Sequence, residues 1–308
     1  MEFDAPTWVA LVDNFLPRED KIHYARSVLT GSEPISDPQV EKIKAEVIER
    51  FSDSVFKKTL GKIPPVRGPL GQAKIEIKPG FSNVKQRAFQ LAGDRREALI
   101  KLIRDLEKEG KIEEGCSDWS SPAFPVPKKD PGKWRLVIDY RKLNDATVVD
   151  GHPIPRIEEI LERQGKFKIW SVLDLKDGFH QIPIHPDSRH YTCMSTPIGT
   201  FQWVVLPMGL QNAQSVFQRV MDWIFKDFPH VDPYIDDIII GSTGSTMEEM
   251  IETHTKYLVA VLEQLAKYEL LVSAEKAQLY MKKVECCGHV MTMGARSQAP
   301  GKLMALQK

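Results

Sequence analysis

The chain has no excess of charge of either sign and few cysteines. Lys plus Arg number 42, and Asp plus Glu also number 42. No global field therefore draws the protein to nucleic acid, and any basic surface must be local. The four cysteines show no metal-ligand spacing, and Cys286 and Cys287 are adjacent, which is poor geometry for a disulfide. A reduced, intracellular protein is expected.

Long apolar runs and a secretion signal are missing as well. No run approaches the roughly 20 apolar residues that span a bilayer, so no membrane partner is expected. The first ten residues, MEFDAPTWVA, are acidic and lack the basic-then-apolar pattern of a signal peptide. What remains is a chain of 308 residues with 42% hydrophobic content, which suits one large or two modest globular domains.

Two turn-rich breaks interrupt the first part of the chain. The stretches TGSEPISDPQ (30–39) and GKIPPVRGPLGQ (61–72) carry Pro and Gly residues that oppose regular structure. Residues 1–60 are interpreted as an N-terminal helical segment to which no role is assigned.

An amphipathic helix is expected at residues 94–110, after the second break. Asp94 is predicted to cap its start, and Gly110 its end. The apolar face repeats at helical spacing through Leu99, Leu102, Ile103 and Leu106.

Beyond about residue 122, short apolar strands are separated by charged turns. Strands are predicted in 123–140 (two strands around a Lys-Asp-Pro-Gly turn), 169–175, 202–207 and the hairpin 232–241. Helices are predicted at 212–228 and near 247–268. Strands and helices mix without the regular alternation of a parallel sheet, so the expected fold class is α+β.

Three carboxylates stand in stretches that otherwise predict buried strands. Asp236 and Asp237 lie at the centre of DPYIDDIIIG, and Asp174 lies within WSVLDLKDGFHQIPI. Burying an unpaired carboxylate costs several kcal/mol, so each of them needs a reason. If the strands lie side by side, the mutual repulsion favours a divalent-metal site. The alternative is a plain hairpin turn at the Asp pair and a turn cap at Asp174, and either motif alone leaves both open.

A basic cluster precedes the acidic motifs, between residues 124 and 145. Charged residues at this density usually lie on a solvent-exposed hairpin without a specific function. The alternative is that Arg135 on a strand and Lys128 before the turn converge on one anion, for which phosphate is the natural partner. The segment carries six positive side chains, Lys128, Lys129, Lys133, Arg135, Arg141 and Lys142, against three negative ones, Asp130, Asp139 and Asp145.

Six motifs, taken in order, resemble those of one family. They are VPKKDPGKWRLVIDYRKLN for the fingers, WSVLDLKDGFHQIPI for the first catalytic motif, TFQWVVLPMGLQNAQSVFQRVM for template gripping, YIDDI for the second catalytic motif, LLVSAEKAQLY for a lysine-bearing segment and VECCGHVMTMG for the primer grip. Their order and spacing over roughly residues 63–306 resemble the reverse transcriptase domain of a Gypsy-type (Metaviridae) LTR retrotransposon polyprotein.

The resemblance implies a right-hand polymerase fold with fingers and palm subdomains and at most the start of a thumb. The reverse transcriptase domain would cover 61–308, with the fingers at roughly 61–168 and the palm at roughly 169–295. Because the chain ends at Lys308, before a full thumb, connection or RNase H domain would fit, a fragment of a longer polyprotein is expected.

The implied activity is that of an RNA-directed DNA polymerase. Such an enzyme adds dNTPs to the 3′ end of a primer annealed to an RNA or DNA template. The implied cofactor is a pair of Mg²⁺ ions, for which Mn²⁺ is a substitute. The expected location is the cytoplasm, within virus-like particles, and the nucleus.

The resemblance also implies which residues carry the function. Asp174, Asp236 and Asp237 would be the catalytic carboxylates, and together with Leu175 they would form the metal site. The implied nucleotide-binding residues are Lys128 and Arg135 on the triphosphate, Asp177 and Gly178 through backbone N–H groups, Phe179 under the sugar, Met208, and Lys276 as general acid to pyrophosphate. For Phe179 the alternative is an ordinary core residue, and for Lys276 a solvated lysine at a helix end.

Three residues depart from the family pattern, and none is a metal ligand. Met208 stands where retroviral enzymes have Gln, Gln214 replaces a usual Pro, and Ala277 follows Lys276 where Cys is common. The departures bear on the template contacts and on the Lys276 loop.

Three other functions compete with DNA synthesis. A catalytically silent, nucleic-acid-binding remnant would keep the fold without turnover, and a primer-extension assay separates the two. An RNA-dependent RNA polymerase would not be expected to keep the bulky Phe179 against a 2′-hydroxyl. A purely structural α+β domain has no reason to place three carboxylates in apolar strands.

Overall fold

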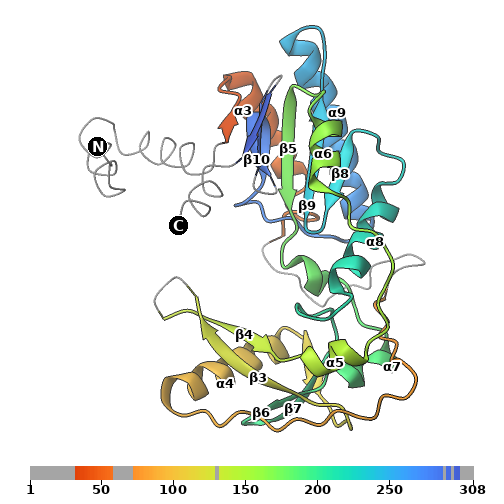
Figure 1. Cartoon of the computed structure of the whole chain (residues 1–308). Coiled ribbons are helices and arrows are strands. Elements are labelled where there is room, and N and C mark those ends of the chain that lie inside the picture. Colours follow the sequence, from red (N-terminus) through yellow and green to blue (C-terminus); the bar gives the residue numbers. More distant parts are fainter. Residues whose placement is uncertain (1–31, 58–71, 129–131, 287–288, 293–294, 299–308) are drawn as a thin grey trace, which may run out of the picture.

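The strands of the protein form two sheets in two bodies, one above the other in Figure 1. The computed structural model describes residues 32–57, 72–128, 132–286, 289–292 and 295–298. Most of the predicted break at 61–72, and the N-terminal segment up to residue 31, lie outside these described residues.

The large sheet has seven strands and occupies the upper body in Figure 1. In spatial order they are β12 (Ala295–Gln298), β11 (His289–Thr292), β10 (Gln278–Cys286), β5 (Ile169–Asp174), β9 (Asp237–Ser242) and β8 (Val231–Tyr234), with β1 (Glu33–Pro34) paired to β10. The helices of this body are α3 (Pro38–Arg50), α6 (Ile157–Gln164), α8 (Ala213–Phe225) and α9 (Met247–Lys267).

The small sheet has five strands and lies in the lower body. Its order is β2 (Ile112–Glu114), β7 (Gly199–Trp203), β6 (Met194–Thr196), β3 (Ser121–Pro127) and β4 (Trp134–Ile138), and α4 (Gly93–Lys108) packs against it. Shorter helical turns are α5 (Arg141–Ala146), η1 (Gly178–Gln181), α7 (Pro186–Arg189) and η2 (His190–Thr192). Among the described helices, none is both long and apolar enough to cross a bilayer.

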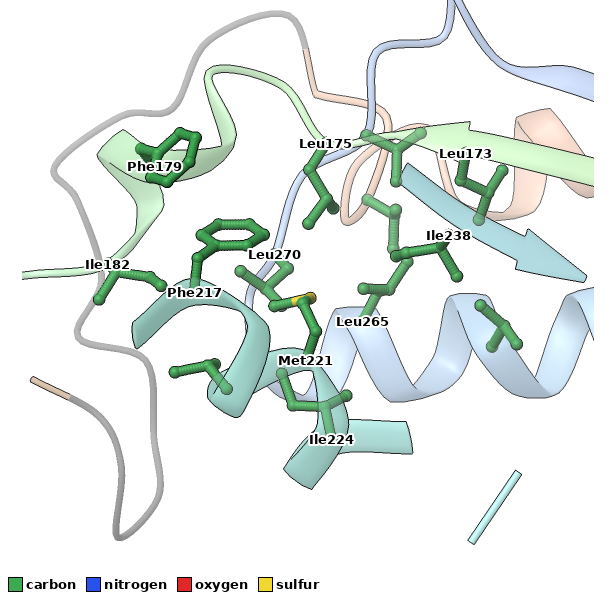
Figure 2. Close-up of a cluster of buried hydrophobic side chains, with 14 of the residues drawn as sticks. Leu173, Leu175, Phe179, Ile182, Phe217, Met221, Ile224, Ile238, Leu265 and Leu270 are labelled. Atoms are coloured by element: carbon green, nitrogen blue, oxygen red, sulfur yellow. The ribbon is translucent and has the colours of Figure 1, made fainter. Parts of the chain in front are cut away.

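Both faces of the large sheet are covered, and for this reason β5 and β9 are almost continuously apolar. Leu173 and Ile238 belong to the cluster that includes Met221 of α8 and Leu265 of α9 (Figure 2). The neighbouring Trp170 belongs instead to a second cluster that includes residues of α6. Complete burial of an apolar side chain contributes about 1.5–3 kcal/mol, so this double covering holds the two strands in one register.

One polar side chain, His254 of α9, lies inside this core. It is fully buried, with Nε2 at 2.7 Å from Ser171 Oγ of β5 and Nδ1 at 2.9 Å from Ser242 Oγ of β9. Each ring nitrogen therefore has a hydroxyl partner, as a buried imidazole requires. Burial, and next the neighbouring His230, lower the pKa of His254 to about 3.

Most predicted elements are confirmed. The predicted helices correspond to α4, α8 and α9, and the two predicted hairpins to β3–β4 and β8–β9. The strand predicted at 169–175 is β5. Gly110 follows α4 with φ 71°, a left-handed conformation that suits glycine at a helix end.

Two local predictions are wrong. Asp94 does not cap α4, because the helix begins at Gly93, its N-cap position is Ala92, and Asp94 lies in the first turn. The strand predicted at 202–207 ends at Trp203, after which Val205 forms only an isolated bridge with Pro183. The chain leaves the small sheet at this point, so the apolar residues after Trp203 pack between elements and do not extend the strand.

The two sheets draw on interleaved parts of the chain. The strands β6 and β7 join the small sheet although they fall within the range predicted for the palm, and β1 joins the large sheet. The predicted subdomain bounds stay a prediction.

Acid should weaken the fold through His254, because the folded protein keeps this imidazole neutral. The folded pKa of about 3 lies below the ordinary value of 6.5. The contribution of His254 to stability is therefore complete above about pH 6.5 and is lost as the pH falls towards 3. Between about pH 6.5 and pH 5 the loss is about 2 kcal/mol.

Urea unfolding at these two pH values measures the effect in the wild type and in His254→Gln. The variant should lose less stability on acidification, whereas His185→Gln, at a partly exposed site, should follow the wild type. Equal losses in the wild type and His254→Gln would contradict a neutral buried imidazole.

Candidate active site

The turn between β8 and β9 is held in a strained conformation by a buried glutamine. Tyr234 and Asp237 are the last paired residues, so Ile235 and Asp236 form the connection. Ile235 has φ 54°, which is unfavourable for a β-branched residue. Gln218 of α8 accepts a hydrogen bond from the Ile235 N–H at 2.8 Å and donates one to the Pro233 carbonyl at 2.9 Å. The helix thus fixes the backbone that presents Asp236.

The three predicted carboxylates come together at one end of two adjacent strands. Asp174, the last residue of β5, is the register partner of Asp237, the first residue of β9. Just beyond this pair, the Leu175 N–H donates to the Asp236 carbonyl at 2.9 Å. The condition that these strands lie side by side is therefore met.

Burial and the neighbouring carboxylates both act on the pKa of Asp237. Its pKa is raised to about 6, by burial first and then by the charges of Asp236 and Asp174, against the opposing effect of Lys276. Lys276 Nζ lies 3.0 and 3.2 Å from the two carboxylate oxygens of Asp174. This hydrogen bond raises the pKa of Lys276, against a smaller opposing effect of burial. The lysine is thus a counter-cation for one of the three carboxylates.

The carboxylates suit a divalent cation in their chemistry but do not form a closed cage. Hard divalent cations take carboxylate and carbonyl oxygens. Among the described residues, no three His, Cys, Asp or Glu side chains are already arranged around a common metal position. The side chain of Leu175 has no ligand atom, so only its carbonyl can join such a site. These oxygen ligands fit Mg²⁺. Lys276 lies close enough to Asp174 to compete with a metal ion for its carboxylate.

The turn that follows β5 approaches the acidic hairpin closely. Asp177 has φ 48° and ψ 43°, a left-handed conformation, and precedes the η1 turn. A Cβ atom added at Gly178 would lie 3.0 Å from Asp236 Cβ and 3.3 Å from Phe217 Cζ. Only glycine fits this approach without a shift of its neighbours.

Phe179 lies in the same turn and is largely buried. Its ring centroid is 5.1 Å from that of Phe217 on α8, and the side chains lie side by side in Figure 2. The residue is 8% exposed. Its place beside Gly178 is compatible with a sugar contact and with an ordinary core role, and contact with the sugar stays a prediction.

Of the other predicted nucleotide-binding residues, Lys276 contacts the acidic site through Asp174, whereas Lys128, Arg135 and Met208 lie elsewhere in the described chain. Lys128 and Arg135 lie on the β3–β4 hairpin of the small sheet, and both are exposed. Met208 is 65% exposed and precedes Gly209, whose carbonyl accepts a hydrogen bond from Asn144. Lys276 lies in a turn before β10 and not at a helix end, its side chain is 66% exposed, and its role as general acid stays a prediction.

Three buried polar side chains around the site were missed by sequence reasoning. Gln218 is one, and its signal is an amide on the apolar face of a predicted helix. Gln181 is another: its amide accepts from the Leu271 N–H and donates to the carbonyls of Lys176 and Leu271. The third is Lys111, whose ammonium lies 3.0 Å from the Asp177 carboxylate. No local pattern around Lys111 marks it.

Known proteins share both the sequence and the fold. Residues 126–291 match the family model described as reverse transcriptase (RNA-dependent DNA polymerase). The Pol polyprotein of Drosophila melanogaster transposon 297 is 34% identical over 231 residues, which are 73% of this chain and 21% of the relative. That of transposon gypsy from the same fly is 35% identical over 235 residues, 73% of this chain and 22% of the relative. The chain thus spans about a fifth of the length of these relatives.

The fold is that of a solved polymerase. The foamy viral protease-reverse transcriptase in complex with dsDNA superposes with a TM-score of 0.76 at 24% identity, over 95% of this chain and 58% of that chain. The predicted α+β right-hand polymerase fold is confirmed. Since the family model covers more than half of the chain and relatives from Gypsy-type retrotransposons match most of it, this chain belongs to the reverse transcriptase (RNA-dependent DNA polymerase) family.

Proposed function

We propose that the chain is an RNA-directed DNA polymerase that adds dNTPs to a primer 3′ end with the help of two divalent metal ions, normally Mg²⁺. The observation that carries the proposal is the pairing of Asp174 with Asp237 beside the Asp236 turn. Solved relatives are described in complex with dsDNA and with an RNA/DNA hybrid, which supports a primed RNA or DNA template as the partner.

The acidic residues would hold the metals. Asp174 and Asp236 would be the principal ligands, Asp237 would be the third carboxylate, and Leu175 would offer its carbonyl. When bound, the ions lower the pKa of the primer 3′-hydroxyl and neutralise charge on the triphosphate. Mn²⁺ takes the same oxygen ligands and substitutes for Mg²⁺.

Residues around the acidic turn would hold the nucleotide. The amides of Asp177 and Gly178 can donate to phosphate oxygens. Lys276 carries its proton at neutral pH, as an ordinary lysine does, so it would have a proton to give to pyrophosphate. Phe179 would lie against the sugar.

Residues farther from the acidic turn would complete the binding site. Lys128 and Arg135 would contact the triphosphate from the small sheet. Met208, exposed beside the turn at Gly209, would face the nucleotide and its template base.

Loss of one acidic ligand should abolish synthesis. Asp236→Asn keeps the size of the side chain but removes a charge that a metal needs, which should slow incorporation by at least about a thousandfold, or about 4 kcal/mol. The measurement is Mg²⁺-dependent dNTP incorporation on a primed RNA template, with the exposed Asp105→Asn as control. Near-normal turnover by Asp236→Asn would show that the metal site is elsewhere. A wild type that binds the template without extending the primer would instead support a silent remnant.

Arg135 should matter more than another exposed cation on the same segment. Arg135→Ala should raise the KM for dNTP roughly ten- to a hundredfold, the value of a charge-assisted contact of about 1.5–3 kcal/mol. Lys142→Ala, also exposed, should leave KM near the wild-type value. Equal effects of the two changes would show that the basic cluster acts through its overall positive charge and not through a specific contact of Arg135.

Phe179 should select the sugar. Phe179→Val opens space for a 2′-hydroxyl while remaining apolar, so the ratio of kcat/KM for dNTP over rNTP should fall, with a modest loss for dNTPs. Phe228→Val, on the same body but beyond the end of α8, is the control. An unchanged ratio in Phe179→Val would show that Phe179 is an ordinary core residue and does not select the sugar.

A further inference from the structure

A buried lysine links the small sheet to the turn beside the acidic site. Lys111 stands between α4 and β2, where its N–H donates to the Leu106 carbonyl and its carbonyl accepts from the Val204 N–H. These two bonds, each 3.0 Å long, fix its backbone on the small sheet. Its side chain is 7% exposed and reaches across to Asp177, which follows β5 of the large sheet.

The ammonium of Lys111 is held by two carboxylates. Nζ lies 2.8 Å from Glu109 Oε2 and 3.0 Å from Asp177 Oδ2. Burial opposes the charged form, but the two hydrogen-bonded carboxylates outweigh it and raise the pKa of Lys111. The lysine is therefore charged when buried, and removal of a partner from such a pair is costly.

Lys111 is the cation that the structure shows hydrogen-bonded to the Asp177 carboxylate, and the charges of His180 and Lys176 have smaller effects on the pKa of Asp177. His180, the nearest basic group on η1, stacks on Trp203 with ring centroids 5.2 Å apart. Its pKa is lowered to about 4, by burial first and then by the charge of Lys111, so the imidazole is neutral at physiological pH. The main partner of the Asp177 carboxylate is thus Lys111, whose single charge is shared with Glu109.

The location of Asp177 gives the pair a consequence for nucleotide binding. Asp177 is in the left-handed region, and the next residue, Gly178, approaches Asp236 so closely that a Cβ atom added there would lie 3.0 Å from Asp236 Cβ. A free carboxylate at this point would repel a triphosphate that approached the amides of this turn. Lys111 draws the carboxylate aside and offsets part of its charge.

We propose that Lys111 is a positioning residue for the incoming nucleotide: through Asp177 it holds the Asp177–Gly178 turn ready for the triphosphate and lowers the repulsive charge of the turn. The inference rests on the proposed polymerase function and extends it to a residue of the small sheet. Lys111 itself does not touch the nucleotide, so its effect should appear in dNTP affinity and depend on Asp177.

A double-mutant cycle tests the proposal on the full chain. The variants are Lys111→Met, Asp177→Asn and the double variant, with Lys111→Arg as a rescue and the exposed Lys101→Met as control. Lys111→Met should raise the KM for dNTP roughly tenfold, change kcat less than about threefold, and be largely rescued by arginine. The double variant should have a lower KM than Lys111→Met, since the uncompensated carboxylate is gone.

The KM values of these variants decide between a positioning role for Lys111 and a purely structural one. An unchanged KM in Lys111→Met, or additive effects in the double variant, would overturn the positioning role while leaving the polymerase function intact. A wild type that incorporates no dNTP would overturn both. If thermal melting shows that Lys111→Met is unfolded, Asp177→Asn alone decides, because its side chain is 51% exposed and tolerates change. A KM raised severalfold in Asp177→Asn supports the role, and an unchanged KM overturns it.

Discussion

The pairing of β5 with β9 is the constraint on which the rest of the structure depends. Side chains alternate along strands, so a slip of one residue would exchange the faces of every apolar side chain in β5. The clusters on both faces prevent this slip, and the register they enforce sets Asp174 opposite Asp237. Carboxylates that repel one another are thereby held close together at the end of two buried strands. The pKa of Asp237 is raised, first by burial and then by the charges of Asp236 and Asp174, so the position of this carboxylate disfavours its charged form.

The neighbouring turns store further strain around the same point. Ile235 and Asp177 both adopt left-handed backbone conformations, which cost free energy in residues other than glycine. Each is held by a buried polar side chain from another element: Gln218 holds the first and Lys111 the second. Buried polar groups usually cost stability unless every partner is in place. Their concentration here indicates that the fold gives up stability to keep one set of backbone atoms and carboxylates in position.

Local sequence patterns predicted most of the elements and the acidic set, because those features depend on near neighbours. The hairpin around Asp236 and the helix around Phe217 follow from spacing over a few residues. The supports of the site could not be predicted in this way. Lys111 meets Asp177 across 66 positions, and Gln181 meets Leu271 across 90. Asp94 was misplaced as a cap because α4 begins one residue before it, at a glycine that no cap signal marks.

The central claim is that the three carboxylates form a divalent-metal site, and direct metal binding tests it. Free Mn²⁺ can be followed by electron paramagnetic resonance as the protein is titrated, in the presence of dNTP, with the wild type and Asp174→Asn. The wild type should bind Mn²⁺ saturably, in competition with Mg²⁺, and the variant should bind at least about tenfold more weakly. Equal binding by the two proteins would contradict the claim, since Asp174 would then hold no metal.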